Sequence, residues 1–236
     1  MNLYILVEGS ETEPIVYRSW ISHMCPNLVE VASPIDLNGS HYYMISGYGN
    51  PSYLRRIRDA LRDIKDNTHV NHFIICVDTE EMTTHNRRAK LSEELHKAET
   101  ETLVRDSNPN FKTHVIVQNC CFETWLLGNT KMMKQSPTSS ELLALKRHYD
   151  VRSDDPELMT CPQLKRYRNR ADFHYRYLQA MFREQNPRLL YNKANPSAVT
   201  ERHYLDALVE RCTTTDHLCS LSDALTVFNS IYKVIK

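Results

Sequence analysis

Three short apolar runs constrain the fold of this chain more than any other feature of its sequence. They cover residues 3–7 (LYILV), 72–77 (HFIICV) and 113–118 (THVIVQ), and segments with helical periodicity lie between them. Strands that are apolar along nearly their whole length must be covered on both faces, as strands of parallel sheets are. The alternation therefore predicts an α/β fold with a mostly parallel sheet flanked by helices.

The remaining elements follow from the same patterns. We expect a further strand at 28–33, helices at 13–24, 52–66 and about 86–105, and a short helix at 121–127. In the first of these helices, Ile15, Trp20 and Ile21 are expected to face inward. Residues 36–51 (DLNGSHYYMISGYGNP) are expected to form a loop.

The character of the sequence changes near residue 130. A polar stretch follows, and beyond it only helices are expected, at about 140–149, 162–184, 199–211 and 220–234. We therefore divide the chain into an α/β domain, residues 1–130, and an α-helical C-terminal appendage, residues 131–236, that packs on it.

Composition excludes several classes of protein. The chain has 236 residues, of which 41% are hydrophobic and 25% charged, as in ordinary globular domains. No stretch approaches the ~18 uncharged apolar residues of a membrane span. The N-terminus lacks the basic region of a signal peptide, so we expect a cytoplasmic protein. An odd number of cysteines, seven, without a CxxC pair, favours reduced thiols, and the spacing in CTTTDHLC (212–219) is expected to be structural.

Acidic residues stand where the expected strands end. Glu8 follows the first strand, Asp78 and Glu80 follow the strand at 72–77, and Glu123 follows the strand at 113–118. The carboxyl ends of neighbouring parallel strands share one edge, so these side chains are expected to converge in one crevice. Clustered carboxylates repel one another, and a divalent cation stabilises them. Oxygen ligands suit Mg²⁺ or Mn²⁺, as one ion or two.

Simpler structural roles compete with metal binding. Ser10 and Glu13 in SETE fit a capping box at a helix N-terminus, so Glu13 stays open between capping and metal binding. Asp78 alone fits a helix N-cap. Glu8 stands beside Gly9 without an evident capping role, and its combination with Asp78 and Glu80 favours a metal site.

The segments around these acids resemble the Toprim domain of topoisomerases, primases and several nucleases. ILVEGSETE (5–13) resembles its first motif, and FIICVDTEE (73–81) resembles its DxD-type motif with Glu80 at the second acidic position. Within that superfamily, NCCFETWLL (119–127) and LLYNKANP (189–196) resemble segments of OLD-family (overcoming lysogenization defect) and RloB-like nucleases. The resemblance extends to the Toprim subunits of phage-defence systems such as PARIS. It covers residues 3–130 in fold and, in pattern, 185–234.

The resemblance implies a Toprim-like, Rossmann-like fold and a metal-dependent endonuclease of prokaryotic antiviral defence that arrests or kills the infected cell. Its substrate would be DNA or RNA, including tRNA. Glu8, Asp78 and Glu80 would be catalytic metal ligands, with Glu13 and Glu123 as further candidates. Lys193 would be an active-site lysine that stabilises the scissile phosphate. The competing interpretation of Lys193 is an ordinary solvent-exposed lysine.

A basic segment suggests where nucleic acid would bind. Cations interleave with tyrosines between residues 165 and 183, and the candidate contacts are Lys165, Arg166, Arg168, Arg170 and Arg176. Arginine contacts phosphate and tyrosine stacks on bases. The alternative is the solvated face of an amphipathic helix, and the net charge of zero argues against extensive phosphate contact.

Two other functions remain open. The chain has no G-x-x-x-x-G-K-[ST] loop, so an ABC- or AAA-type ATPase partner could gate it as an otherwise silent regulatory subunit. A metal-dependent phosphohydrolase acting on a small substrate is the third possibility. The helical C-terminal half offers a surface for homodimerisation.

Overall fold

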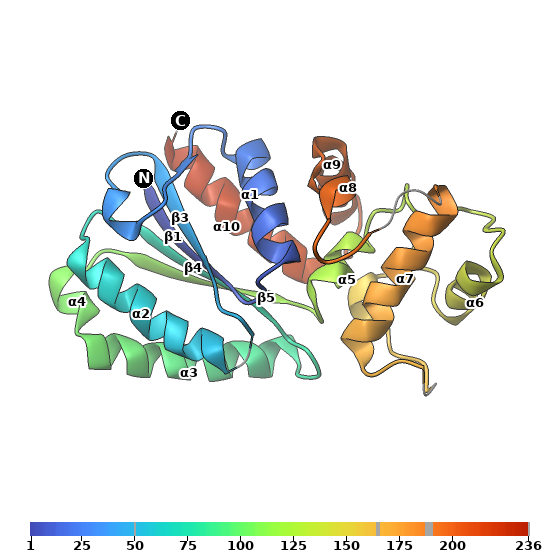
Figure 1. Cartoon of the computed structure of the whole chain (residues 1–236), viewed down its shortest axis with the longest axis horizontal. Coiled ribbons are helices and arrows are strands. Elements are labelled where there is room, and N and C mark those ends of the chain that lie inside the picture. Colours follow the sequence, from blue (N-terminus) through green and yellow to red (C-terminus); the bar gives the residue numbers. More distant parts are fainter. Residues whose placement is uncertain (50, 164–165, 187–190, 236) are drawn as a thin grey trace. The chain divides into compact units, whose positions relative to one another are not determined.

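The chain forms two compact units (Figure 1). The computed structural model describes residues 1–49, 51–163, 166–186 and 191–235. The sheet unit contains Met1–Val77, Thr84–Val117 and the chain from Ala224 on, and the helical unit contains Asp78–Thr83 and Gln118–Asp223. These units differ from the division expected at residue 130. Residues 118–130 belong to the helical unit, and the last helix contributes to the core of the sheet unit.

The sheet has five strands, all parallel, in the order β2-β3-β1-β4-β5. The strands are β1 (Asn2–Val7), β2 (Val29–Glu30), β3 (His41–Ser46), β4 (His72–Asp78) and β5 (Lys112–Gln118). In the register of the sheet, Val7 lies opposite Ser46 of β3 and Cys76 of β4. The predicted α/β fold with a parallel sheet is confirmed.

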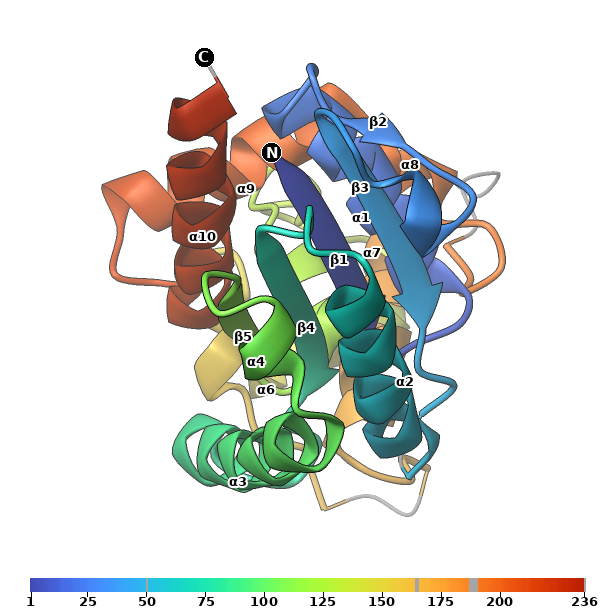
Figure 2. The same ribbon diagram turned by 90° about the vertical axis from the view of Figure 1, so that its left-hand side faces the viewer.

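Helices cover both faces of this sheet, as the apolar strands require (Figure 2). On one face lie α2 (Ser52–Asp66) and α3 (Thr84–Thr102), followed by the short α4 (Val104–Ser107). Tyr4 and Leu6 of β1 share a buried apolar cluster with Ile57 of α2 and Leu91 of α3. Alternate strand residues therefore point into two separate cores.

The other face of the sheet packs against α1 (Thr12–Met24) and the part of α10 (Cys219–Ile235) that begins at Ala224 (Figures 1 and 2). The rings of Tyr17 in α1 and Phe228 in α10 lie 6.4 Å apart, centroid to centroid. Both side chains are almost completely buried. This contact explains why the last helix joins the sheet unit, although it is more than a hundred residues from the nearest strand in sequence.

Three expectations about local structure in the sheet unit were wrong. The expected loop at 36–51 contains β3, whose Tyr42 and Met44 are buried on one face of the strand. The strand at 28–33 is reduced to the exposed pair Val29–Glu30. Ile15 is 40% exposed, whereas Trp20 and Ile21 are buried as expected. Glycine and asparagine in 36–51 suggested a loop, but they flank the strand and do not interrupt it.

The helical unit contains α5 (Phe122–Leu126), α6 (Ser140–His148), α7 (Arg170–Gln185), α8 (Ser197–Thr200), α9 (Arg202–Thr214) and the start of α10. Two turns of 3₁₀-helix, Pro34–Asp36 and Pro156–Leu158, lie in the sheet unit and the helical unit respectively. The ring of Phe182 in α7 stacks on Tyr204 of α9 and on Tyr191. The expected helix at 162–184 begins only at Arg170, because Asn169 caps it by accepting a hydrogen bond from the Asp172 amide.

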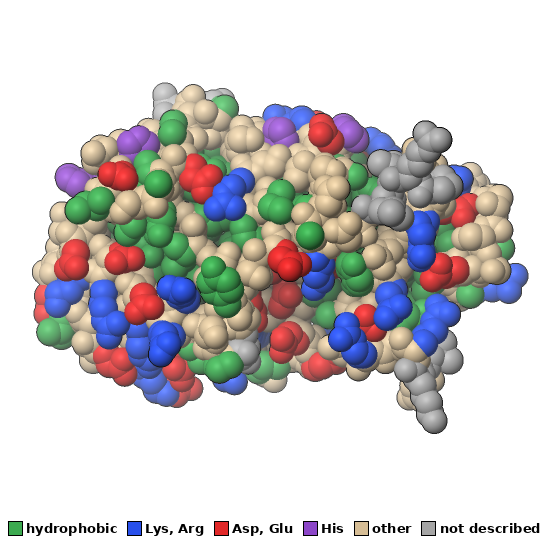
Figure 3. Space-filling model, viewed as in Figure 1, with side chains coloured by type: hydrophobic (Ala, Val, Ile, Leu, Met, Phe, Trp, Pro, Cys, Tyr) green, Lys and Arg blue, Asp and Glu red, His purple; other side chains and the backbone are tan. Residues whose placement is uncertain are grey.

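Charges of both signs interleave on the surface over α2 and α3 (Figure 3). Arg58 of α2 and Glu101 of α3 form an ion pair with an N···O distance of 2.8 Å, and Lys97 pairs with Glu93 within α3. The mixture of both signs on this surface is consistent with the net charge of zero.

Among the described residues, no helix has both the length and the apolar character needed to span a bilayer.

The paired histidines of the sheet unit predict acid sensitivity. His72 Nδ1 and His114 Nε2 lie 2.8 Å apart on β4 and β5. Burial, with the nearby charges of His114 and Lys112, lowers the pKa of His72 to about 4, and burial also lowers the pKa of His114. Because the unfolded imidazoles titrate near pH ~6.5, stability is complete above that pH and decreases as the pH falls toward 4.

We expect the free energy of unfolding to drop by up to about 1.4 kcal/mol per pH unit for each histidine in this window. Urea unfolding at pH 7.0, 6.0 and 5.0 measures the slope, and His72→Gln should flatten it. Replacement of the exposed His96 by Gln is the control. A His72→Gln variant as acid-sensitive as the wild type would contradict the prediction.

Candidate active site

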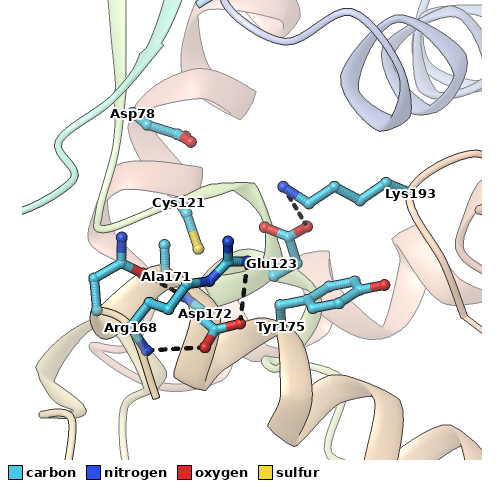
Figure 4. A pocket seen from close by; sticks show the side chains of 9 residues that line it. Asp78, Cys121, Glu123, Arg168, Ala171, Asp172, Tyr175 and Lys193 are labelled. Carbon is cyan, nitrogen blue, oxygen red and sulfur yellow. Dashed lines mark hydrogen bonds and ion pairs between the residues drawn. The ribbon is translucent and has the colours of Figure 1, made fainter. Parts of the chain in front are cut away.

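One cavity of about 540 Å³ lies entirely within the helical unit (Figure 4). This size is within the usual range for ligand sites. The cavity brings together three of the residues singled out in the sequence, Asp78, Glu123 and Lys193. Its other lining residues are Cys121, Arg168, Asn169, Ala171, Asp172 and Tyr175. The cavity thus joins residues from the end of β4, the start of α5, the start of α7 and the loop before α8.

Backbone hydrogen bonds between the segments at the ends of β4 and β5 fix the position of Asp78. The amide of Thr79 donates to the carbonyl of Gln118 at 2.9 Å, and the amide of Glu80 donates to the carbonyl of Cys120 at 3.0 Å. These hydrogen bonds hold Asp78 beside Cys121 at one wall of the cavity (Figure 4).

Glu80 does not line the cavity, although the sequence placed it beside Asp78. Its backbone has a positive φ of 54°, and its side chain is exposed. Its carbonyl accepts a hydrogen bond from Arg170 Nη2 at 2.8 Å, and the amide of Arg170 donates to Glu81. Arg170 therefore ties the turn after β4 to the start of α7. A metal-binding role for Glu80 stays a prediction.

Glu123 supplies a second, more deeply buried carboxylate. It lies in the first turn of α5, only 5% of it is exposed, and its Oε1 accepts a hydrogen bond from the Tyr191 hydroxyl at 3.4 Å. Lys193 Nζ lies 3.9 Å from the same oxygen and 5.8 Å from the centre of the Tyr175 ring. The Lys193 side chain is 57% exposed. A cation and a buried carboxylate thus face each other in the cavity.

Asp172 lines the cavity and holds two arginines, Arg168, which also lines it, and Arg176. Arg176 Nε donates to Asp172 Oδ1 at 3.2 Å, and the Arg168 guanidinium lies 3.7 Å from the same oxygen. Burial raises the pKa of Asp172, but the Arg168 amide and the Arg176 side chain outweigh it, so that the pKa lies below its ordinary value. The Arg168 and Arg176 side chains are 86% and 50% exposed and can still reach an anion.

Of the two remaining basic candidates, the structure describes Arg166 alone. The Arg166 guanidinium lies over the Tyr167 ring and contacts its hydroxyl. Lys165 lies outside the described residues. Nucleic-acid binding by the basic segment stays a prediction.

Glu8 and Glu13 belong to the sheet unit. The Glu8 carboxylate accepts a hydrogen bond from Arg87 Nη2 at 3.0 Å, and both side chains are almost completely buried. Arg87 also lies over the Tyr53 ring. Because Asp78 belongs to the helical unit, convergence of Glu8 with Asp78 stays a prediction. The sequence did not indicate that Arg87 would neutralise the buried charge of Glu8.

Glu13 lies near the start of α1. One of its oxygens, Oε2, is 3.3 Å from the Gly9 amide, which donates to it. The helix starts at Thr12 after Glu11, and Glu11 makes no capping hydrogen bond with its side chain. The expected capping box between Ser10 and Glu13 therefore does not describe this helix start. Metal binding by Glu13 stays a prediction.

Sequence reasoning missed several residues of the cavity and its surroundings. Asp172, Tyr175 and Cys121 line it, and no spacing in the sequence marks them as neighbours of Asp78. Cys121 also belongs to a buried group with Cys120 and His174.

Comparison with protein-family models, with curated proteins and with solved structures gave no match. The functional assignment therefore depends on the cavity and on the sequence motifs.

Proposed function

We propose that this chain is a metal-dependent nuclease that hydrolyses nucleic-acid phosphodiester bonds at the cavity of the helical unit. The observation that carries the proposal is the presence of Asp78, Glu123 and Lys193 in one cavity. These are two carboxylates and a cation that the sequence motifs single out independently. The resemblance to Toprim nucleases adds the expected setting, a cytoplasmic protein of prokaryotic anti-phage defence.

The donor set fits Mg²⁺ or Mn²⁺. Asp78 and Glu123 offer carboxylate oxygens, which these hard cations prefer over nitrogen or sulfur. Glu123 is 5% exposed, and only the exposed Lys193 ammonium, 3.9 Å from its Oε1, would have to move aside for an ion; the neutral Tyr191 hydroxyl donates to the same oxygen. When bound, such an ion supplies Lewis acidity and a water of lowered pKa.

The other residues of the cavity have roles that follow from their positions. The ammonium of Lys193 can move from Glu123 to a phosphate oxygen, where it stabilises the charge that develops during attack. Arg168 of the cavity, and Arg176 one turn of α7 beyond Asp172, offer exposed guanidinium groups to neighbouring phosphates. The ring of Tyr175 offers a stacking surface for an unpaired base, which favours a single-stranded or looped substrate.

A second candidate is a nuclease subunit that is silent until a partner activates it. The buried ion pair between Glu8 and Arg87 favours it, since a carboxylate held by arginine is not available as a metal ligand. In this candidate an ATPase partner, or a second copy of the chain, releases Glu8 from Arg87. Co-purification with an ATPase and cleavage only in its presence would distinguish the two.

A substrate panel tests the proposal directly. The purified chain is incubated with labelled plasmid DNA, single-stranded DNA and total tRNA, each with Mg²⁺, Mn²⁺ or EDTA. We expect cleavage that requires the divalent cation and is lost in Glu123→Gln. The matched control is Glu141→Gln, which alters an exposed residue of α6 paired with Arg183. Cleavage that persists in EDTA, or equally in Glu123→Gln, would reject the assignment. Hydrolysis of small phosphate esters alone would indicate a phosphohydrolase.

A further inference from the structure

We propose that Cys120, Cys121 and His174 form a binding site for a thiophilic divalent cation, Zn²⁺, whose ligands differ from the carboxylates although Cys121 also lines their cavity. Their two sulfur atoms and one ring nitrogen all lie within 4.8 Å of one another, and all three residues are buried. Within the part of the chain that the structure describes, no other group of three such side chains is this close. The proposal does not depend on the nuclease assignment.

The distance between two of the three ligand atoms matches tetrahedral zinc. Cys120 Sγ lies 3.7 Å from His174 Nδ1. Zinc bonds of about 2.3 Å to sulfur and about 2.0–2.1 Å to nitrogen, at tetrahedral angles, separate the two ligand atoms by about 3.6 Å. An ion could therefore enter between these atoms with little movement of either side chain.

The orientation of His174 is suitable for a ligand. The ring is completely buried, and Nε2 lies 3.3 Å from the carbonyl oxygen of Met159. Donation from Nε2 to that carbonyl leaves the lone pair of Nδ1 directed at Cys120 and Thr124. Zinc-bound histidines are usually held in this way, with the second ring nitrogen donating to a carbonyl or a carboxylate.

The Thr124 hydroxyl can be hydrogen-bonded whether or not an ion is bound to the three ligands. Its hydroxyl oxygen accepts hydrogen bonds from the amides of Cys120 and Cys121, and it lies 2.8 Å from His174 Nδ1. It is also 3.5 Å from Cys121 Sγ. When an ion occupies the lone pair of Nδ1, the hydroxyl proton can turn to the Cys121 thiolate, so no buried polar group loses its partner.

The chemistry of the ligands selects the ion. Thiolate and imidazole prefer zinc to magnesium or manganese, whereas the carboxylates of Asp78 and Glu123 have the opposite preference. Binding would release the thiol protons to solvent. The ion would join the start of α5 to α7, and these two helices carry Glu123 and Tyr175 of the cavity. Three protein ligands leave one position of the tetrahedron open.

The first test uses the wild-type protein. The full chain is stripped with a chelator, then dialysed against Zn²⁺ or Co²⁺ with excess Mg²⁺ present to occupy carboxylate sites. We expect one zinc per chain after dialysis, and a cobalt form with the intense absorption of thiolate-to-metal charge transfer. A protein that retains no zinc, or a cobalt form without this absorption, would overturn the proposal, leaving a hydrogen-bonded cluster organised by Thr124.

Variants then assign the ligands. Cys120→Ser and Cys121→Ser should each weaken zinc binding at least tenfold, while Cys219→Ser should leave it unchanged. This control removes an exposed thiol from CTTTDHLC (212–219), the segment whose cysteine spacing was expected to be structural. Unchanged affinity in both cluster variants, or equal loss in Cys219→Ser, would reject the site. If a cluster variant does not fold, the cobalt spectrum of the wild type decides.

Discussion

Asp78→Asn is expected to reduce metal-dependent cleavage by about a thousandfold or more while the protein stays folded. The substitution keeps the shape of the side chain and removes its charge from a cavity that also holds Glu123. A thousandfold loss corresponds to about 4 kcal/mol in the activation barrier. An effect of that size is expected when a metal ligand is removed, because the ion positions the nucleophile and neutralises developing charge.

The measurement compares single-turnover cleavage rates at saturating Mn²⁺ with binding of Mn²⁺ itself. Loss of both rate and metal affinity indicates that Asp78 binds the ion. Asp216→Asn, an exposed residue of the same unit, is the matched control. A folded Asp78→Asn variant that cleaves within about threefold of the wild-type rate would exclude Asp78 from the active site.

Glu8→Gln is a less direct test of the same idea. Glu8 forms a buried ion pair with Arg87, and both side chains are less than a tenth exposed. Removing one charge leaves the other buried without its partner, which typically costs about 3–5 kcal/mol. Lost cleavage in Glu8→Gln could therefore reflect lost stability. A matched Glu8→Gln/Arg87→Met variant removes both charges together and separates the two effects.

The fold was largely predictable because burial on both faces leaves a clear mark on a strand. Residues 3–7 and 73–77 are almost entirely apolar, and such runs occur in few other environments. Strand β3 was missed because its apolar stretch, residues 42–45, is short and glycine and asparagine stand on both sides of it. The start of α7 was misplaced because Arg166 and Arg168 continue the basic pattern, although the helix begins after the cap at Asn169.

The candidate site was predictable only in part. Asp78 and Glu123 stand at or after the carboxyl ends of strands, where functional side chains of parallel sheets gather. Lys193 was singled out only because its segment resembles a motif. Tertiary contacts over long sequence separations decide the rest. Cys121 and His174 are 53 residues apart, and nothing in their spacing indicates that they meet. Arg87, the partner of Glu8, lies 79 residues away on α3.

Arg211→Met is expected to destabilise the helical unit by about 3 kcal/mol or more. The guanidinium is 4% exposed and binds three backbone carbonyls, those of Gly128, Val151 and Asp154, at 2.7–3.0 Å. One side chain of α9 thus holds the loops on either side of α6. Methionine preserves much of the volume but leaves three buried acceptors without donors, each at a cost of about 1–3 kcal/mol.

The two tryptophans allow the effect to be measured in the unit where it arises. Trp20 lies in the sheet unit and Trp125 in the helical unit, so Trp20→Phe leaves a single tryptophan, excited selectively beyond the absorption of tyrosine, that reports on the helical unit. In this background, Arg211→Met should lower the urea midpoint of Trp125 fluorescence clearly. Arg202→Met, which breaks an exposed pair with Asp206 in the same helix, should change the free energy by less than about 1 kcal/mol. Equal effects of the two substitutions would mean that the carbonyls around Arg211 find water when it is removed, and that the loops do not depend on it.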